Sequence, residues 1–209
     1  MEAAPLSCRT ACIGCLAPVR YTQFMAERNI PHRLPTVQEY LEMEETASVR
    51  HEYVGGMIYT QAGADRQHNQ IAGNVFGLLW NTAREGPCRV YQNDMKLRTV
   101  DDVFYYPDVM VVCESVGESS VYEEGPCLIV EVASSSTESI DRREKMLAYK
   151  KIPTLRAYLI VAKDERRVER HWRDDDGEWR QGEVVGEDGI VPIPCPGPVR
   201  LTLDEVYEG

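Results

Sequence analysis

The sequence predicts an α/β fold in which a mixed central sheet is flanked by helices. Helix signals begin at the Thr36–Glu39 capping box and at Asp65, each followed by apolar residues at helical spacing. Short apolar runs typical of buried strands lie at Val109–Val112, Cys127–Val130 and Ala157–Val161. Because helices and strands alternate along the chain, they are expected to pack around one core.

The first part of the chain is predicted to form a helix, a hairpin and a second helix. The first helix runs to about Glu45, and the Gly55–Gly56 pair then turns a hairpin, since glycine tolerates the positive φ of a tight turn. The second helix runs to about Arg84 and ends at Gly86–Pro87. Its inner stripe is predicted from four apolar residues: Ile71, Val75, Leu78 and Leu79.

The second part is predicted to be richer in strands. A run from Phe104 to Val112 passes through Pro107–Asp108, where the proline marks a strand start or an edge. A charged helix follows Glu131 and its polar turn and stops at Pro153. Further strands are expected at Arg89–Gln92, Met95–Thr99, Arg167–Trp172, Glu178–Val184 and Val199–Leu203, with a Pro-rich segment at Val191–Pro198.

Composition indicates an ordinary globular chain of 209 residues that suits one domain. Residues 1–24 differ from the rest and are interpreted as an appended or disordered arm, with the domain at 25–209. No apolar stretch is long enough for a membrane span. The seven cysteines are scattered, and Cys113 and Cys127 fall in apolar runs where a free thiol packs as a small hydrophobe, so a reduced, cytoplasmic protein is expected.

The arm contains cysteines whose spacing could suit a metal ion. Cys8, Cys12 and Cys15 offer three thiols, and His32 is the one further ligand within easy reach, whereas a closed zinc site needs four ligands. Cys12 and Cys15 also match a redox C-x-x-C pattern, but no strand precedes them as that interpretation requires. Neither pattern predicts a site strongly.

One group of polar residues is typical of phosphodiester hydrolysis. Asp108 and Glu131 lie on successive strands, and two carboxylates that point into one space can share Mg²⁺, which prefers oxygen ligands. Lys145, on the following helix, could orient the attacking water. The simpler alternatives are an ordinary ion pair at Glu131, a solvated helical pair between Asp141 and Lys145, and a surface or hydrogen-bonded role for His68.

The ordered set of motifs resembles the PD-(D/E)XK nuclease superfamily, and more closely its Uma-type (Uma-two) branch of restriction endonucleases. The resemblance spans about Thr36 to Val206. It implies a restriction-endonuclease-like core with an extra N-terminal helix and hairpin and an extra C-terminal hairpin. The motifs are Thr36-Val-Gln-Glu-Tyr-Leu41, the Glu52 hairpin, His68, Tyr106-Pro-Asp-Val-Met-Val-Val112, Leu128-Ile-Val-Glu-Val-Ala-Ser-Ser-Ser-Thr137, the helix with Asp141, Lys145 and Tyr149, and Tyr158-Leu-Ile-Val161.

The resemblance implies metal ligands for this chain. Asp108 and Glu131 would bind Mg²⁺ or Mn²⁺, with the carbonyl of Val132 as a third ligand. Glu52 would supply a further carboxylate. The resemblance also implies a homodimer, since cutting two strands needs two sites.

The sequence departs from the superfamily pattern at one position. The superfamily places a lysine two residues after the glutamate, and here Ala133 stands there. The Uma-type branch resembles this sequence in carrying the lysine on the next helix, which points to Lys145, and Lys96 is the other candidate. The missing lysine also motivates an alternative function, a catalytically inactive nuclease fold that serves as a binding or interaction module.

Nucleic acid, DNA in particular, is the implied partner, although the net charge is −11. An acidic chain disfavours non-specific binding of polyanions, so any contact with nucleic acid must use a local basic patch. The most basic stretch carries Arg142, Arg143, Lys150 and Lys151 around Lys145. A second candidate, interleaved with acidic residues, comprises Arg166, Arg167, Arg170, Trp172 and Arg173.

Overall fold

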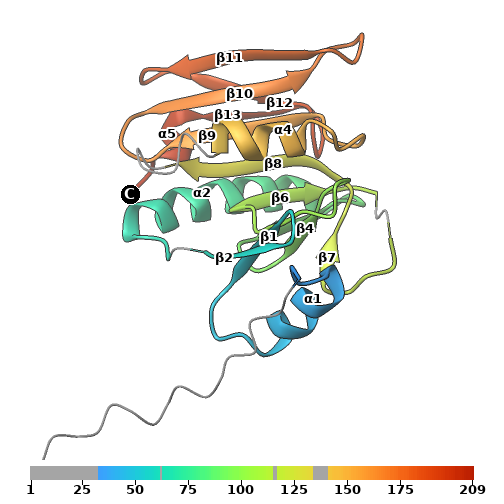
Figure 1. Ribbon diagram of the computed structural model, residues 1–209. Helices are drawn as coiled ribbons and strands as arrows, with labels where there is room; N and C mark the ends of the chain where they lie inside the picture. Colours follow the sequence, from blue (N-terminus) through green and yellow to red (C-terminus); the bar gives the residue numbers. More distant parts are fainter. Residues whose placement is uncertain (1–32, 62, 115–116, 134–140) are drawn as a thin grey trace, which may run out of the picture. The chain divides into compact units, whose positions relative to one another are not determined.

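A six-stranded mixed sheet, in the order β11-β10-β9-β8-β6-β3, organises the chain (Figure 1). The pair β8 and β9 is parallel, and the other neighbours are antiparallel. Every residue of these two central strands is buried, as their apolar sequences predict. The strands are β3 (Arg89–Gln92), β6 (Val109–Val112), β8 (Pro126–Ala133), β9 (Ala157–Ala162), β10 (Arg167–Arg173) and β11 (Trp179–Val185).

One face of this sheet packs against helix α2 (Arg66–Ala83) and the C-terminal elements. Of the predicted inner stripe, Ile71, Val75 and Leu79 are buried, whereas Leu78 packs at the edge of the cluster. The C-terminal elements are the hairpin of β12 (Ile190–Ile193) and β13 (Val199–Thr202) and the short helix α5 (Leu203–Val206).

The other face packs against the charged segment and part of a second sheet. The segment begins as the π-helical turn η1 (Asp141–Lys145) and continues as α4 (Met146–Tyr149). The second sheet has the order β2-β1-β5-β4-β7, and helix α1 (Val37–Thr46) packs on it. Its strands are β1 (His51–Val54), β2 (Met57–Thr60), β4 (Lys96–Arg98), β5 (Phe104–Tyr105) and β7 (Tyr122–Glu123).

The α/β class, the N-terminal helix and hairpin and the C-terminal hairpin β10–β11 are confirmed. Thr36 and Glu39 form the predicted capping box, and Asp65 caps α2 by accepting a hydrogen bond from the His68 amide. Gly55 and Gly56 turn the first hairpin at φ of 57° and 84°. These local signals therefore specify where the elements begin and turn.

The strand predictions hold in one place and miss in another. The strand start predicted at Pro107–Asp108 is confirmed, since β6 begins at Val109, but the residues before the proline form β5, which belongs to the other sheet. Proline lacks the amide hydrogen that a continuous ladder needs. The Pro-rich segment contains a strand that was not predicted, β12, in which Pro192 pairs opposite Arg200 on a two-stranded edge.

The prediction of isolated thiols is also wrong for Cys113 and Cys127. Disulfides join Cys88 to Cys113 and Cys127 to Cys195. The β3–β6 register, in which Arg89 pairs with Val112, places the first two cysteines opposite each other at the strand ends. Strand pairing thus gathers residues that lie far apart in the sequence.

The computed structural model describes residues 33–61, 63–114, 117–133 and 141–209, with the backbone alone at 141 and 142. The predicted arm at 1–24, with its cysteines and the nearby His32, lies outside these residues, so the division into an arm and a domain at 25–209 stays a prediction. No helix in the described ranges is long and apolar enough to cross a membrane.

Candidate active site

Asp108 and Glu131 come from neighbouring antiparallel strands. Val109 pairs with Val130, and continuing that register by one residue places Asp108 opposite Glu131. Residues directly opposite each other in an antiparallel pair lie on the same face of the sheet. Asp108 is 6% exposed and Glu131 4%, so two carboxylates are held in the protein interior near one end of this strand pair.

Two donors fix the carboxylate of Asp108. Its Oδ2 accepts a hydrogen bond of 2.7 Å from the Val132 amide and lies 3.1 Å from Nε2 of His68. Its Oδ1 has no hydrogen-bond partner within the described residues. Asp108 therefore has a fixed orientation and one oxygen available for a ligand.

His68 reaches Asp108 from the first turn of α2. Burial opposes a charge on His68, but the hydrogen bond to Asp108 and the charge of that carboxylate outweigh burial and raise the pKa of His68. The histidine is therefore a hydrogen-bonded partner of Asp108, in line with the simpler of its two interpretations.

Lys145 and Tyr149 both bind Glu131. The ammonium of Lys145 lies 3.2 Å from Glu131 Oε1, and the hydroxyl of Tyr149 donates to the same oxygen at 2.8 Å. Lys145 is 8% exposed and Tyr149 is fully buried. Burial and, next, the charge of Glu131 raise the pKa of Tyr149 well above its ordinary value, so this hydroxyl keeps its proton at neutral pH.

Glu52 contacts the same ammonium. Its Oε1 is 3.2 Å from Lys145 Nζ, so the lysine bridges a carboxylate of β1 and one of β8. The ring of Tyr105 lies 5.5 Å from the ammonium, and the Tyr105 hydroxyl donates to Glu144 at 3.2 Å. The lysine is therefore within ion-pair distance of two carboxylates in a largely buried site.

Ala133 occupies the position, two residues after Glu131, at which the superfamily pattern has a lysine. Side chains alternate along β8, so Ala133 lies on the same face as Glu131 and packs with Ile129 and Ile160. A methyl group there supplies no charge. The ammonium beside Glu131 comes instead from η1, a π-helical turn of the kind often found at functional sites.

Lys96, the other lysine candidate, lies elsewhere. Its ammonium is 5.6 Å from the centre of the Tyr106 ring. Burial lowers its pKa, and the charged groups that act on it include Glu44 and Arg50. Among the described side chains, Lys96 forms no ion pair with Asp108 or Glu131.

The predicted basic patch is only partly a free surface. Arg143 is exposed, but Lys151 pairs with Asp101 at 2.5 Å. The ammonium of Lys150 lies 5.4 Å from the Trp179 ring, and burial lowers its pKa. The side chains of Asp141 and Arg142 lie outside the described part of the chain.

The arginines of the late hairpin have structural contacts. Arg166 pairs with Asp204, and Arg167 with Glu165 and Glu183. Arg170 stacks 4.0 Å from the centre of the Trp172 ring. Arg173 donates to three backbone carbonyls, those of Leu155, Gly177 and Lys150. This second basic candidate therefore serves largely to hold the sheet together.

Two residues of the site had no role assigned from sequence. Tyr149 was expected on the Lys145 helix face, and the structure gives it a hydrogen bond to Glu131. Tyr105 lies in the Tyr105–Asp108 run and contacts the lysine through its ring. Tyr149 lies four positions after Lys145, which is the helical spacing that could have indicated it, whereas Tyr105 lies on β5 and no such spacing points to it.

The fold is that of a nuclease-fold α/β protein. A solved structure of a "putative nuclease" from Anabaena variabilis matches this chain with a TM-score of 0.67, covering 83% of this chain and 97% of that one. The sequences are 15% identical, so this likeness concerns the fold alone.

The family follows from the sequence comparisons. The model of the Uma2 family, described as "Putative restriction endonuclease", matches residues 37–204, and the chain belongs to this family. An uncharacterized protein of Synechocystis sp. is 35% identical over 144 residues, covering 68% of this chain and 76% of its own. A second uncharacterized Synechocystis protein is 32% identical over 163 residues, covering 76% of this chain and 92% of its own.

Proposed function

We propose that this chain is a divalent-metal-dependent nuclease that hydrolyses phosphodiester bonds. Asp108 and Glu131 hold Mg²⁺ or Mn²⁺, and Lys145 positions the attacking water. The observation that carries the proposal is the 3.2 Å contact between the Lys145 ammonium and Glu131 Oε1. It supports a migrated lysine at a site where Ala133 occupies the usual lysine position.

The donor set fits a hard divalent cation. Asp108 and Glu131 are buried carboxylates, and Asp108 Oδ1 is open to a ligand. Ala133 directs its carbonyl to Lys163 on the β9 side, so the preceding residue, Val132, faces the Asp108 side with both its amide and its carbonyl. Carboxylate and carbonyl oxygens are the ligands that Mg²⁺ prefers.

Each residue then has a distinct part. A bound Mg²⁺ would lower the pKa of a coordinated water and neutralise charge on the phosphate. Lys145, which contacts both Glu131 and Glu52, would donate a hydrogen bond to the attacking water. Tyr149 fixes the orientation of Glu131, and His68 and the Val132 amide fix that of Asp108.

The proposed substrate is DNA, bound as a phosphate backbone rather than read by base contacts. Arg143, which is exposed and lies two residues before Lys145 in the chain, would contact the phosphates. A homodimer would supply a second active site for the second strand. The acidic net charge favours weak binding that depends strongly on salt.

The test is cleavage of single-stranded and double-stranded DNA and RNA with Mg²⁺ or Mn²⁺. We expect Asp108→Asn to lower the rate by at least about a hundredfold. Asp101→Asn is the matched control, since Asp101 is exposed and pairs with Lys151 outside the site. Equal cleavage by wild type and Asp108→Asn would refute the proposal.

The alternative is a nuclease fold retained for binding without catalysis. It is favoured by one observation, since Glu131 Oε1 is already occupied by Lys145 and Tyr149. Calorimetric titration with Mn²⁺ separates the two functions. Binding that Glu131→Ala abolishes supports the nuclease, and no binding at millimolar metal supports the alternative.

A further inference from the structure

Four cysteines from four separate segments meet at one end of the six-stranded sheet. Cys88 directly precedes β3, and Cys113 directly follows β6. Cys127 is the second residue of β8, and Cys195 follows β12. They lie 25 and 68 residues apart within the two disulfide pairs, so tertiary structure alone brings them together.

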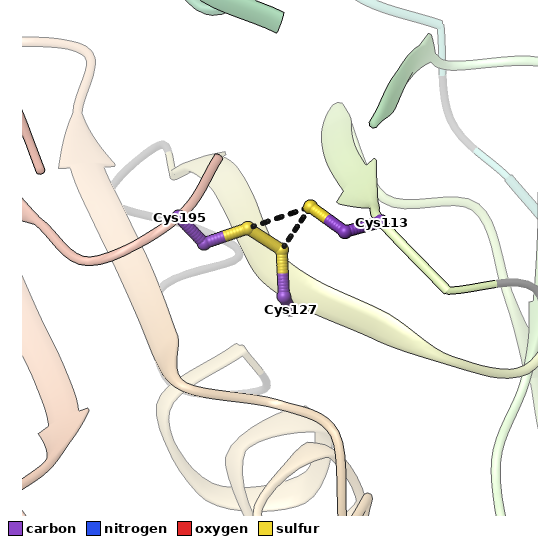
Figure 2. Close-up of side chains that lie close together, drawn as sticks. All are labelled: Cys113, Cys127 and Cys195. Atoms are coloured by element: carbon purple, nitrogen blue, oxygen red, sulfur yellow. Dashed lines mark hydrogen bonds between the residues drawn. A yellow bond between two sulfur atoms is a disulfide. The ribbon is translucent and has the colours of Figure 1, made fainter. Parts of the chain in front are cut away.

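Three of the four sulfur atoms form one compact group. Besides the two disulfides, Cys113 Sγ lies 3.5 Å from Cys127 Sγ and 3.6 Å from Cys195 Sγ, and Figure 2 shows these three side chains converging. Cys88 is joined to the group through its bond to Cys113. Within the described ranges, Cys113, Cys127 and Cys195 are the one set of three Cys, His, Asp or Glu side chains whose ligand atoms lie within 4.8 Å of one another.

The spacing of Cys113 from Cys127 and from Cys195 suits a tetrahedral metal ion, and Cys88, bonded to Cys113, is the nearest candidate for a fourth ligand. Four thiolate sulfurs at about 2.3 Å from a zinc ion lie about 3.8 Å from one another. The 3.5 Å and 3.6 Å separations are within a few tenths of an ångström of that value. Four sulfur ligands in a tetrahedral arrangement are typical of zinc.

We propose that, once both disulfides are reduced, Cys88, Cys113, Cys127 and Cys195 bind one zinc ion. A dithiol reductant supplies the electrons: each disulfide takes up two electrons and two protons from one dithiol, which becomes a disulfide itself. The four thiols then lose four protons as they ligate Zn²⁺. The same sulfurs thus form either two disulfides or one zinc site.

This zinc ion is structural and separate from the proposed catalytic metal. Four protein ligands leave no open position for substrate. Asp108 lies five residues before Cys113 and Glu131 four residues after Cys127, which at about 3.3 Å per residue puts the two sites roughly 13 to 17 Å apart along the strands. The ion would fasten the segment between β12 and β13 to the central strands.

A cavity gives the cysteines a route to solvent. Its volume is about 600 Å³, and its lining includes Cys113, Cys127 and Cys195. Cys113 is the partly exposed member of the group. A reductant or a metal ion can therefore reach the sulfurs without unfolding the sheet.

The test uses the full-length chain, reduced with a dithiol under argon, freed of excess reductant and incubated with Zn²⁺. We expect one zinc ion per chain by elemental mass spectrometry. Co²⁺ in its place should give the visible bands of a tetrahedral ion together with thiolate-to-cobalt charge transfer. No zinc in the reduced protein, or iron in its place, would overturn the inference.

Variants locate the metal. Cys195→Ser should lose the zinc, and the triple variant Cys8→Ser, Cys12→Ser, Cys15→Ser should retain it, because its changes lie outside the group. Zinc that is retained by Cys195→Ser and lost by the triple variant would overturn the inference. The cobalt spectrum of the wild type counts thiolates directly, so the test stands even if Cys195→Ser does not fold. Asp108→Asn should keep its zinc, which separates this site from the proposed nuclease site.

Discussion

The ammonium of Lys145 lies 3.2 Å from Glu131 Oε1, fourteen residues away in the chain, and both residues are more than nine-tenths buried. A second carboxylate, Glu52, lies at the same distance from the ammonium. Charges taken out of water are stable only when they are paired and hydrogen-bonded. This relationship therefore affects both stability and the proposed catalysis.

Removing the lysine should destabilise the fold. Lys145→Met should lower the free energy of unfolding by about 3 to 5 kcal/mol, because Glu131 and Glu52 lose their buried counter-charge. The measurement is urea denaturation followed by circular dichroism. Lys151→Met is the matched control, since its pair with Asp101 is exposed and should contribute about 0 to 1 kcal/mol. Equal losses in the two variants would contradict this prediction.

The hydroxyl of Tyr149 should stabilise the fold through its hydrogen bond to Glu131. Tyr149→Phe keeps the ring in the core and removes one hydrogen bond to a carboxylate, which should cost about 1.5 to 3 kcal/mol in urea denaturation. Tyr105→Phe is the control, because its hydroxyl meets the exposed Glu144. If Tyr105→Phe lowers the free energy of unfolding as much as Tyr149→Phe does, the hydrogen bond to Glu131 contributes no more than an ordinary one.

Asp65 should make stability depend on pH in acid. Its hydrogen bonds with the His68 amide and then with Lys163 lower its pKa. A lowered acid pKa contributes stability above the unfolded value of about 3.9, and that stability is lost as the pH falls through the folded value. Asp65→Ala should therefore have a lower urea midpoint than wild type at pH 7, and the difference should shrink below about pH 3.9.

Asn at position 65 provides the control for that titration. Asparagine still caps a helix but carries no ionisable group. Asp65→Asn should therefore keep part of the wild-type advantage over Asp65→Ala, and that part should not vanish in acid. A constant gap between wild type and Asp65→Ala down to the lowest pH would show that the carboxylate charge contributes nothing.

Arg143 should contribute to binding of nucleic acid through phosphate contact. Arg143→Ala should weaken binding of a labelled DNA duplex for all sequences alike and reduce the slope of log affinity against log salt by about one. Fluorescence anisotropy without divalent metal measures this without cleavage. Arg200→Ala, at an exposed position of β13, should leave the slope unchanged. If Arg143→Ala and Arg200→Ala change the slope of log affinity against log salt equally, Arg143 does not contact the DNA phosphates specifically.

Local sequence signals account for much of the fold. The Thr36 capping box, the Asp65 cap and the Gly55–Gly56 turn depend on residues a few positions apart, and each forms as predicted. The apolar runs at β8 and β9 likewise predict strands buried on both faces. Short-range physics is enough for such elements, since each is specified by its own residues.

The errors arise where distant partners decide the structure. Ile190–Ile193 is a strand because β13 pairs with it, which outweighs the low strand preference of its proline. The break between β5 and β6 places Tyr105 and Val109 in different sheets, a choice that depends on what each half can pair with. Composition could not reveal the cysteine group, because the register of β3, β6 and β8 assembles it.

The sequence by itself determined the α/β class, the main helix starts and turns, and the candidate trio of Asp108, Glu131 and Lys145. Only the tertiary structure decided that Lys145 lies against Glu131 and Glu52 while Lys96 does not. The physical reason is distance along the chain. Residues fourteen or more positions apart meet only after the strands have paired and η1 has packed on their face, and no local preference encodes that contact.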